Sequence, residues 1–119
     1  MRTAFPVTTC AHGDPVAQYD VYPNPSHSAD QGIPFVVVIQ SDLLDALATR
    51  LVIPLATPDY AGPAPETLCP SITVQGQPLR ALTHLTAPLP TRQLKRRVEN
   101  LALQSNALVT ALDMVLSGV

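Results

Sequence analysis

The sequence predicts a mainly β fold, a small antiparallel barrel or sheet with a C-terminal helix packed on it. Three patterns support this fold class: short apolar runs of strand length, a hairpin around a glycine-containing turn, and a final segment with apolar residues at helical spacing. The chain has 119 residues, of which 46% are apolar, and this is enough for one domain with a single modest core.

The beginning of the chain differs from the rest, because residues 1–17 contain Pro6, Gly13 and Pro15 and show no sustained apolar period. We therefore expect a flexible N-terminal extension over residues 1–17 and one folded domain over residues 18–119. Pro6 also interrupts any signal-peptide pattern, and no later apolar run approaches the roughly 18 residues of a membrane span. The expectation is a cytoplasmic protein that does not contact a membrane.

Two predicted strands flank a long loop in the first third of the folded part. Gln18–Tyr22 alternates polar and apolar residues at its start, which is typical of a short half-buried strand, and Pro23 is expected to end it. Residues 23–34 are rich in turn formers and predict a mobile loop. Phe35–Ile39 is a continuous β-branched apolar run, which predicts a central strand covered on both faces.

The next segment alternates between irregular stretches and a strand. Residues 41–45 combine a helix-capping residue with two leucines and allow one helical turn or a tight loop. Residues 50–55 predict a strand in which Pro54, lacking an N–H donor, marks an edge or the strand's end. Residues 57–65 form another proline-rich loop.

The clearest hairpin combines Ser71–Val74, a turn over residues 75–78 that contains glycine, and a second strand over residues 79–85. Pro88 and Pro90 are expected to break the segment that follows it.

The last segment predicts an amphipathic helix that begins near Ser105 or Asn106 as its cap. Its apolar residues recur three and four positions apart: Leu108, Ala111, Leu112, Val115 and Val119. Val109 and Leu116 are also apolar, so more than one face of the helix is expected to be buried, for example by the sheet and by another subunit.

The distribution of charge limits the kinds of partner that the chain is expected to bind. The net charge is −2, so direct binding to nucleic acid by this chain alone is not favoured, because such affinity comes mainly from Lys and Arg. Most of the positive charge gathers in Arg92, Lys95, Arg96 and Arg97. Such a cluster is usually a solvated face, and a site for an acidic partner is the alternative.

Few residues suggest chemistry. The two cysteines, Cys10 and Cys69, exclude a disulfide scaffold, and two free thiols are expected in preference to a metal site that joins Cys10 and His12 to a distant histidine. Asp42 and Asp45 are expected to be a cap and a surface carboxylate, and His84 a partly buried structural histidine in a strand. With no phosphate loop, nucleophile elbow or zinc-protease motif, we expect a protein that acts by binding, without a cofactor or resident metal, and is not an enzyme.

One block of sequence resembles a known family. Phe35–Ala56 reads FVVVIQSDLLDALATRLVIPLA and is similar to the CcdB family's block of a strand, Gln-Ser-Asp, two aliphatics, Asp, and Arg-x-Val-Ile-Pro-Leu-Ala. Gln18–Tyr22 is similar to the family's first strand, and Leu116–Val119 resembles the aliphatic-x-Gly-aliphatic end of its terminal helix. The resemblance covers residues 18–119.

The resemblance implies an SH3-like barrel with a terminal helix, paired as a homodimer. It implies a toxin that binds the DNA gyrase A subunit and traps its DNA cleavage complex, together with a CcdA-like antitoxin as second partner, whose disordered tail folds on binding. Carried over position by position, the gyrase-binding residues would be Leu43, Leu44, Asp113, Leu116, Ser117, Gly118 and Val119.

Two positions depart from the family pattern. Ser117 stands where the family has a tryptophan before the final glycine, and Asp113 replaces an asparagine. Losing an aromatic anchor commonly costs about 2 kcal/mol of binding or more. The alternative is therefore a family-like protein that binds an antitoxin but has a lost or different toxic target.

Overall fold

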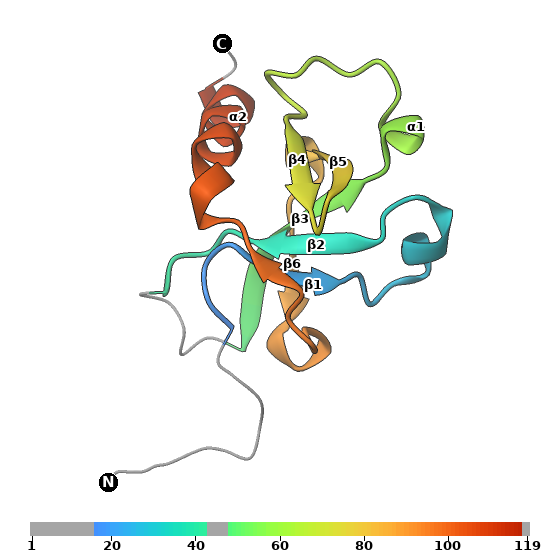
Figure 1. The fold of residues 1–119 in the computed structure, drawn as a ribbon. Helices are drawn as coiled ribbons and strands as arrows, with labels where there is room; N and C mark the ends of the chain where they lie inside the picture. Colours follow the sequence, from blue (N-terminus) through green and yellow to red (C-terminus); the bar gives the residue numbers. More distant parts are fainter. Residues whose placement is uncertain (1–15, 43–47, 118–119) are drawn as a thin grey trace, which may run out of the picture.

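The computed structural model describes residues 16–42 and 48–117, and within them one antiparallel sheet carries a C-terminal helix (Figure 1). The strands of the sheet are β1 (Asp20–Pro23), β2 (Phe35–Val38), β3 (Thr49–Ala56), β4 (Ser71–Val74), β5 (Gln77–Ala81), β6 (Ala87–Pro90) and β7 (Glu99–Asn100). They lie in the order β4-β5-β3-β2-β1-β7, with β6 paired to β3. The sheet curls into a nearly closed barrel, which confirms the predicted fold class.

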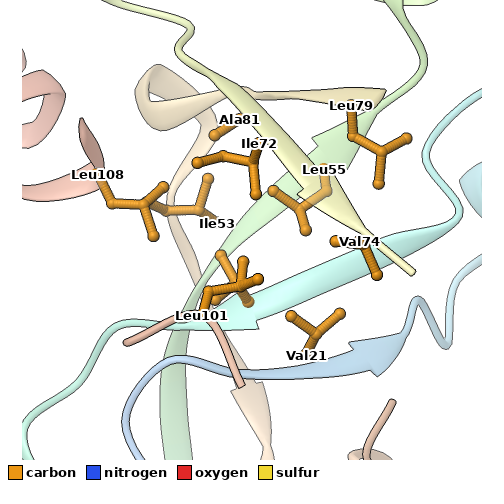
Figure 2. Packing of buried hydrophobic residues seen from close by; sticks show 10 residues of the cluster. Val21, Ile53, Leu55, Ile72, Val74, Leu79, Ala81, Leu101 and Leu108 are labelled. Carbon is orange, nitrogen blue, oxygen red and sulfur yellow. The ribbon is translucent and has the colours of Figure 1, made fainter. Parts of the chain in front are cut away.

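Strand β2 is the central strand that its composition predicts, because it lies between β1 and β3. Val37 points into the main core, and Val36 and Val38 belong to a second core on the other side of the sheet. The main core is shown in Figure 2 and consists of Val21, Val37, Ile53, Leu55, Ile72, Val74, Leu79, Ala81, Leu101 and Leu108. The second core consists of Tyr22, Val36, Val38, Val52 and Leu94. A strand covered on both faces needs apolar residues at every position.

The prediction that Pro88 and Pro90 interrupt the segment after the hairpin is wrong, because both prolines lie within β6 and pair with β3. Thr91 donates its N–H to the carbonyl of Ala48 (2.8 Å), and the polar groups of the backbone alternate in direction along a strand. The nitrogens of both prolines therefore point away from β3, where no hydrogen bond is lost. The two prolines leave the outer edge of β6 without N–H donors for another strand.

Pro54 neither ends β3 nor lies on an edge strand, contrary to prediction, since β3 continues to Ala56 and lies between β2 and its neighbours β5 and β6. Ile39 donates to the carbonyl of Leu51, so the nitrogen of Pro54 faces away from β2. On that far side β3 pairs with β6 up to Val52 and with β5 from Leu55 onward. Pro54 thus lies between the part of β3 that pairs with β6 and the part that pairs with β5.

Two side chains help to close the barrel between its edge strands. The amide of Gln104 accepts from the N–H of Thr73 in β4 and donates to its carbonyl, each at 3.0 Å. Glu99 of β7 accepts from the N–H of Gln75 at 2.8 Å. The hairpin is thereby tied to the segment that leads into the helix.

The β4–β5 hairpin is confirmed, although β5 already begins at Gln77. Gln75 and Gly76 both have positive φ angles, 50° and 82°, as a two-residue type I′ turn requires. The second strand ends at Ala81, and a 3-10 turn, η3 (Thr83–Leu85), replaces the predicted continuation. His84 is therefore exposed on a turn and not partly buried in a strand.

The proline-rich loops contain short helical turns. Residues 23–34 include η1 (His27–Gln31), whose N-cap Ser26 accepts from the N–H of Ser28, and residues 57–65 include α1 (Pro58–Ala61). Before β1, Val16 packs against the second core and the N–H of Ala17 donates to Asp20.

The predicted C-terminal helix is present as α2 (Ser105–Ser117). It begins at Ser105, as predicted, but it follows directly on the 3-10 turn η5 (Ala102–Gln104), so the predicted cap is not formed. Ser105 is already helical, and its hydroxyl donates to the carbonyl of Ala102 instead of capping N–H groups.

Candidate protein-docking site

The sequence-predicted site residues fall into two groups. Asp113, Leu116 and Ser117 lie together in the last turns of α2, and all three are exposed. Leu43, Leu44, Gly118 and Val119 lie outside the described residues.

Helix α2 is held by its first half. Leu108 and Ala111 are buried, and Leu108 is part of the main core (Figure 2). The helix contacts η3 and reaches past the sheet, with its C-terminal end pointing away from the barrel (Figure 1). Residues that follow the buried turns at helical spacing therefore emerge into solvent.

An apolar strip, the α2 stripe, runs along the helix and consists of Val109, Leu112, Val115 and Leu116. Leu112 also packs against the main core. They are three or four positions apart and so share one side of the helix. Leu112 is half-buried, whereas Val109 is 44%, Val115 39% and Leu116 83% exposed. A run of exposed aliphatic side chains on one helix face is typical of a protein-binding surface.

One exposed residue on the turn next to α2, Leu85, was not indicated by the sequence. Leu85 is 45% exposed on η3, the turn against which α2 packs. Because its segment predicts a strand, sequence pattern alone contains no signal that places Leu85 beside the helix. It adds exposed apolar area on a turn that contacts α2.

Ser117 uses its hydroxyl within the helix. The Oγ atom donates to the carbonyl of Asp113 at 2.7 Å, a bond that satisfies one of the free carbonyls at the helix end. The hydroxyl proton is thus not directed to a partner, and the position offers little apolar surface.

Most of the carboxylates that the structure describes accept hydrogen bonds from backbone N–H groups. Asp20 is fully buried and accepts from the N–H of Ala17, the hydroxyl of Tyr22 and the amide of Asn100. Asp42 accepts from the N–H of Gln18 at 2.7 Å, and the residues that it was predicted to cap, together with Asp45, lie outside the described residues.

Glu66 is an exposed cap of the loop before β4. It accepts from both the hydroxyl and the N–H of Ser71, and these bonds hold the pKa of the Glu66 carboxyl below its ordinary value.

No cluster of three or more potential metal ligands occurs in residues 16–42 and 48–117. The thiol of Cys69 is buried and lies 4.0 Å from the Nδ1 atom of His84. Cys10 and His12, the candidate metal ligands of the sequence, lie outside the described residues. None of the helices in the described part of the chain has the length and apolar character needed to cross a membrane.

These features define the chain as a small, nearly closed antiparallel barrel with a terminal helix that carries an exposed apolar stripe. A solved structure described as an endoribonuclease from a mycobacterial species shares this fold, with a TM-score of 0.64 and 12% sequence identity over 89% of this chain and 95% of the other. A search of curated proteins finds no match.

The family model described as CcdB protein matches residues 18–118, and the chain therefore belongs to the CcdB family. This confirms the resemblance carried by Phe35–Ala56. Family membership places the chain among the toxins of toxin–antitoxin systems.

Proposed function

We propose that this protein is a non-enzymatic toxin that docks on the A subunit of DNA gyrase and traps the enzyme's cleavage complex with DNA. The docking surface is the C-terminal end of α2, and the toxin acts in the cytoplasm, where its target works. The single observation that supports this best is Leu116, which is 83% exposed at the end of a helix anchored in the core. An aliphatic side chain in that position gains most when a partner covers it.

Two features support action by binding. The stripe presents apolar area on a rigid helix, which costs little conformational entropy on docking. The carboxylates of Asp20, Asp42, Glu66 and Glu99 accept hydrogen bonds from backbone N–H groups, and this is a structural use of their charge.

The same surface supports two further partners. A homodimer that pairs α2 with its counterpart would cover Val109 and Leu112, and a two-fold symmetric toxin would match a two-fold symmetric target. A CcdA-like antitoxin would neutralise the toxin by occupying the end of α2.

The experiment is a supercoiled-plasmid cleavage assay with purified gyrase and the full chain. We expect linear DNA to accumulate with the unmodified protein. The Leu116→Asp variant should need a concentration at least about thirtyfold higher, because a charge replaces apolar contact at the centre of the interface.

The matched control is Leu103→Asp, which changes an even more solvent-exposed leucine just before α2. It should trap gyrase as well as the unmodified chain does. Equal activity of all three proteins, or no linear DNA with any of them, would contradict the proposal.

Ser117 favours a second candidate function, in which the chain binds an antitoxin but has a different toxic target. The serine hydroxyl bonds to its own helix and cannot replace an aromatic anchor. Growth arrest that persists in cells with a toxin-resistant gyrase would identify this case.

The Ser117→Trp variant separates the two functions in vitro. If gyrase is the target, the added indole should raise affinity for the A subunit by roughly thirtyfold, measured by titration calorimetry. Unchanged affinity would favour the different target.

A further inference from the structure

The loop between β6 and β7 carries the exposed Lys and Arg side chains of the part of the chain that the structure describes. Among the residues that the structure describes, the exposed Lys and Arg side chains are Arg92, Lys95, Arg96 and Arg97. The two other described cations are turned inward: Arg50 is buried, and Arg80 donates to the carbonyls of Cys69 and Ala64. All nine Asp and Glu residues of the chain lie outside residues 92–97.

This loop, which we call the basic loop (residues 92–97), is fixed at both ends. Leu94 is buried in the second core, and its N–H donates to the carbonyl of Thr91. Val98 packs on the main core and donates to the carbonyl of Val21 at 2.8 Å. Three consecutive cations are therefore displayed between two anchors.

The backbone is strained in the middle of this display. Arg96 has a φ of 63°, a left-handed conformation that costs a residue other than glycine about 1 kcal/mol or more. Arg97 lies 3.9 Å from the fully buried Asp20, which restrains the guanidinium while 47% of the side chain stays exposed. The cations thus belong to a pre-organised turn.

The position of the loop separates it from the docking site. Figure 1 shows it at the opposite end of the barrel from the C-terminus of α2. Glu99, the next carboxylate along the chain, accepts from the N–H of Gln75 at 2.8 Å.

We propose that the basic loop is a second interaction surface, which binds an acidic polypeptide segment independently of the α2 stripe. Guanidinium groups match carboxylates in geometry, and a pre-organised turn loses little entropy on binding.

A nucleic acid fits this surface less well. The negative charge elsewhere on the chain repels an extended polyanion, whereas a short peptide touches only the loop. Proteins that bind single strands stack bases on aromatic side chains. Tyr60 is the exposed aromatic residue of the described chain, and it lies on α1, away from the basic loop (Figure 1).

Fluorescence anisotropy with the full chain tests the proposal at low salt. The probe is a short labelled peptide of alternating glutamate and serine, and the comparison probes are a lysine–serine peptide and single-stranded DNA and RNA of equal length. We expect the acidic peptide to bind most tightly and its affinity to fall as salt is added.

Two triple variants with the same net charge give the decisive comparison. Neutralising the loop with Arg92→Gln, Lys95→Gln and Arg96→Gln should weaken peptide binding about tenfold. Adding the same negative charge elsewhere, with Gln31→Glu, Thr67→Glu and Gln77→Glu, should change it less than about twofold, since these exposed sites lie outside the loop.

Two single variants complete the design. Arg96→Gly suits the left-handed backbone and should keep the fold while weakening binding, which separates loss of charge from loss of structure. Leu116→Asp should bind the peptide normally, so the result does not depend on the gyrase proposal. The proposal is overturned if the acidic peptide does not bind, if both triple variants lose affinity equally, or if a nucleic acid binds more tightly.

Discussion

The first and the last turns of α2 carry similar aliphatic residues in very different surroundings. Leu108 is fully buried against the sheet, whereas Leu116, two helical turns later, is 83% exposed. Both residues lie on one helix, but its buried residues, Leu108 and Ala111, lie in its first half. The same helix therefore stabilises the fold with one end and presents apolar surface with the other.

The largest expected effect tests this division directly. Leu108→Ala should lower the free energy of unfolding by about 2–5 kcal/mol, because it leaves a cavity in the main core. Leu116→Ala, which removes the same atoms from solvent-exposed surface, should stay within about 0.5 kcal/mol. Urea denaturation measures both, and similar losses would show that the helix end is packed in solution.

A smaller effect is expected where the start of α2 is tied to the hairpin. Gln104→Ala removes both hydrogen bonds to Thr73 and should destabilise the protein by about 1 kcal/mol. Gln93→Ala, at an exposed glutamine on the turn η4 (Thr91–Gln93), is the control and should be near neutral. Faster amide exchange confined to β4 would accompany the first change. If both variants are equally stable, the tie does not hold the helix to the barrel.

The smallest effect concerns pH and the loop before β4. The bonds from Ser71 hold the pKa of Glu66 below its ordinary value of 4.5, so the carboxylate stabilises the fold above that pH. This contribution is lost as pH falls through the lowered pKa in the folded protein. The stability difference between the unmodified chain and Glu66→Gln should therefore be present at neutral pH and shrink in acid. A difference that grows in acid would contradict the assignment.

Strands and helix were predictable where a local pattern coincides with the environment. Phe35–Val38 is apolar at every position because both faces of β2 are covered, and Gln75–Gly76 adopts the turn that a hairpin requires. The predictions that Pro54, Pro88 and Pro90 end or interrupt strands were wrong. A proline ends a strand only if its missing N–H faces a neighbouring strand, and that direction depends on register, which the sequence does not display.

The residues of the candidate site, too, were only partly predictable from the sequence. The family block in residues 35–56 and the apolar period of residues 108–116 were visible in the sequence and indicated a toxin whose terminal helix docks on a partner. Leu85 could not be found, because its place beside α2 depends on a turn in what reads as a strand.

The family, the central strand, the hairpin and the helix could all be predicted from the amino-acid sequence, because each depends on short-range periodicity or on a string of residues that the chain carries. Only the tertiary structure decided which aliphatic residues of α2 are buried and which face solvent. It also decided that the basic loop lies at the opposite end of the barrel from the C-terminus of α2 (Figure 1). The burial of the α2 residues and the distance of the helix end from the basic loop depend on how far the barrel extends beneath the helix. Residues distant in the sequence set that extent.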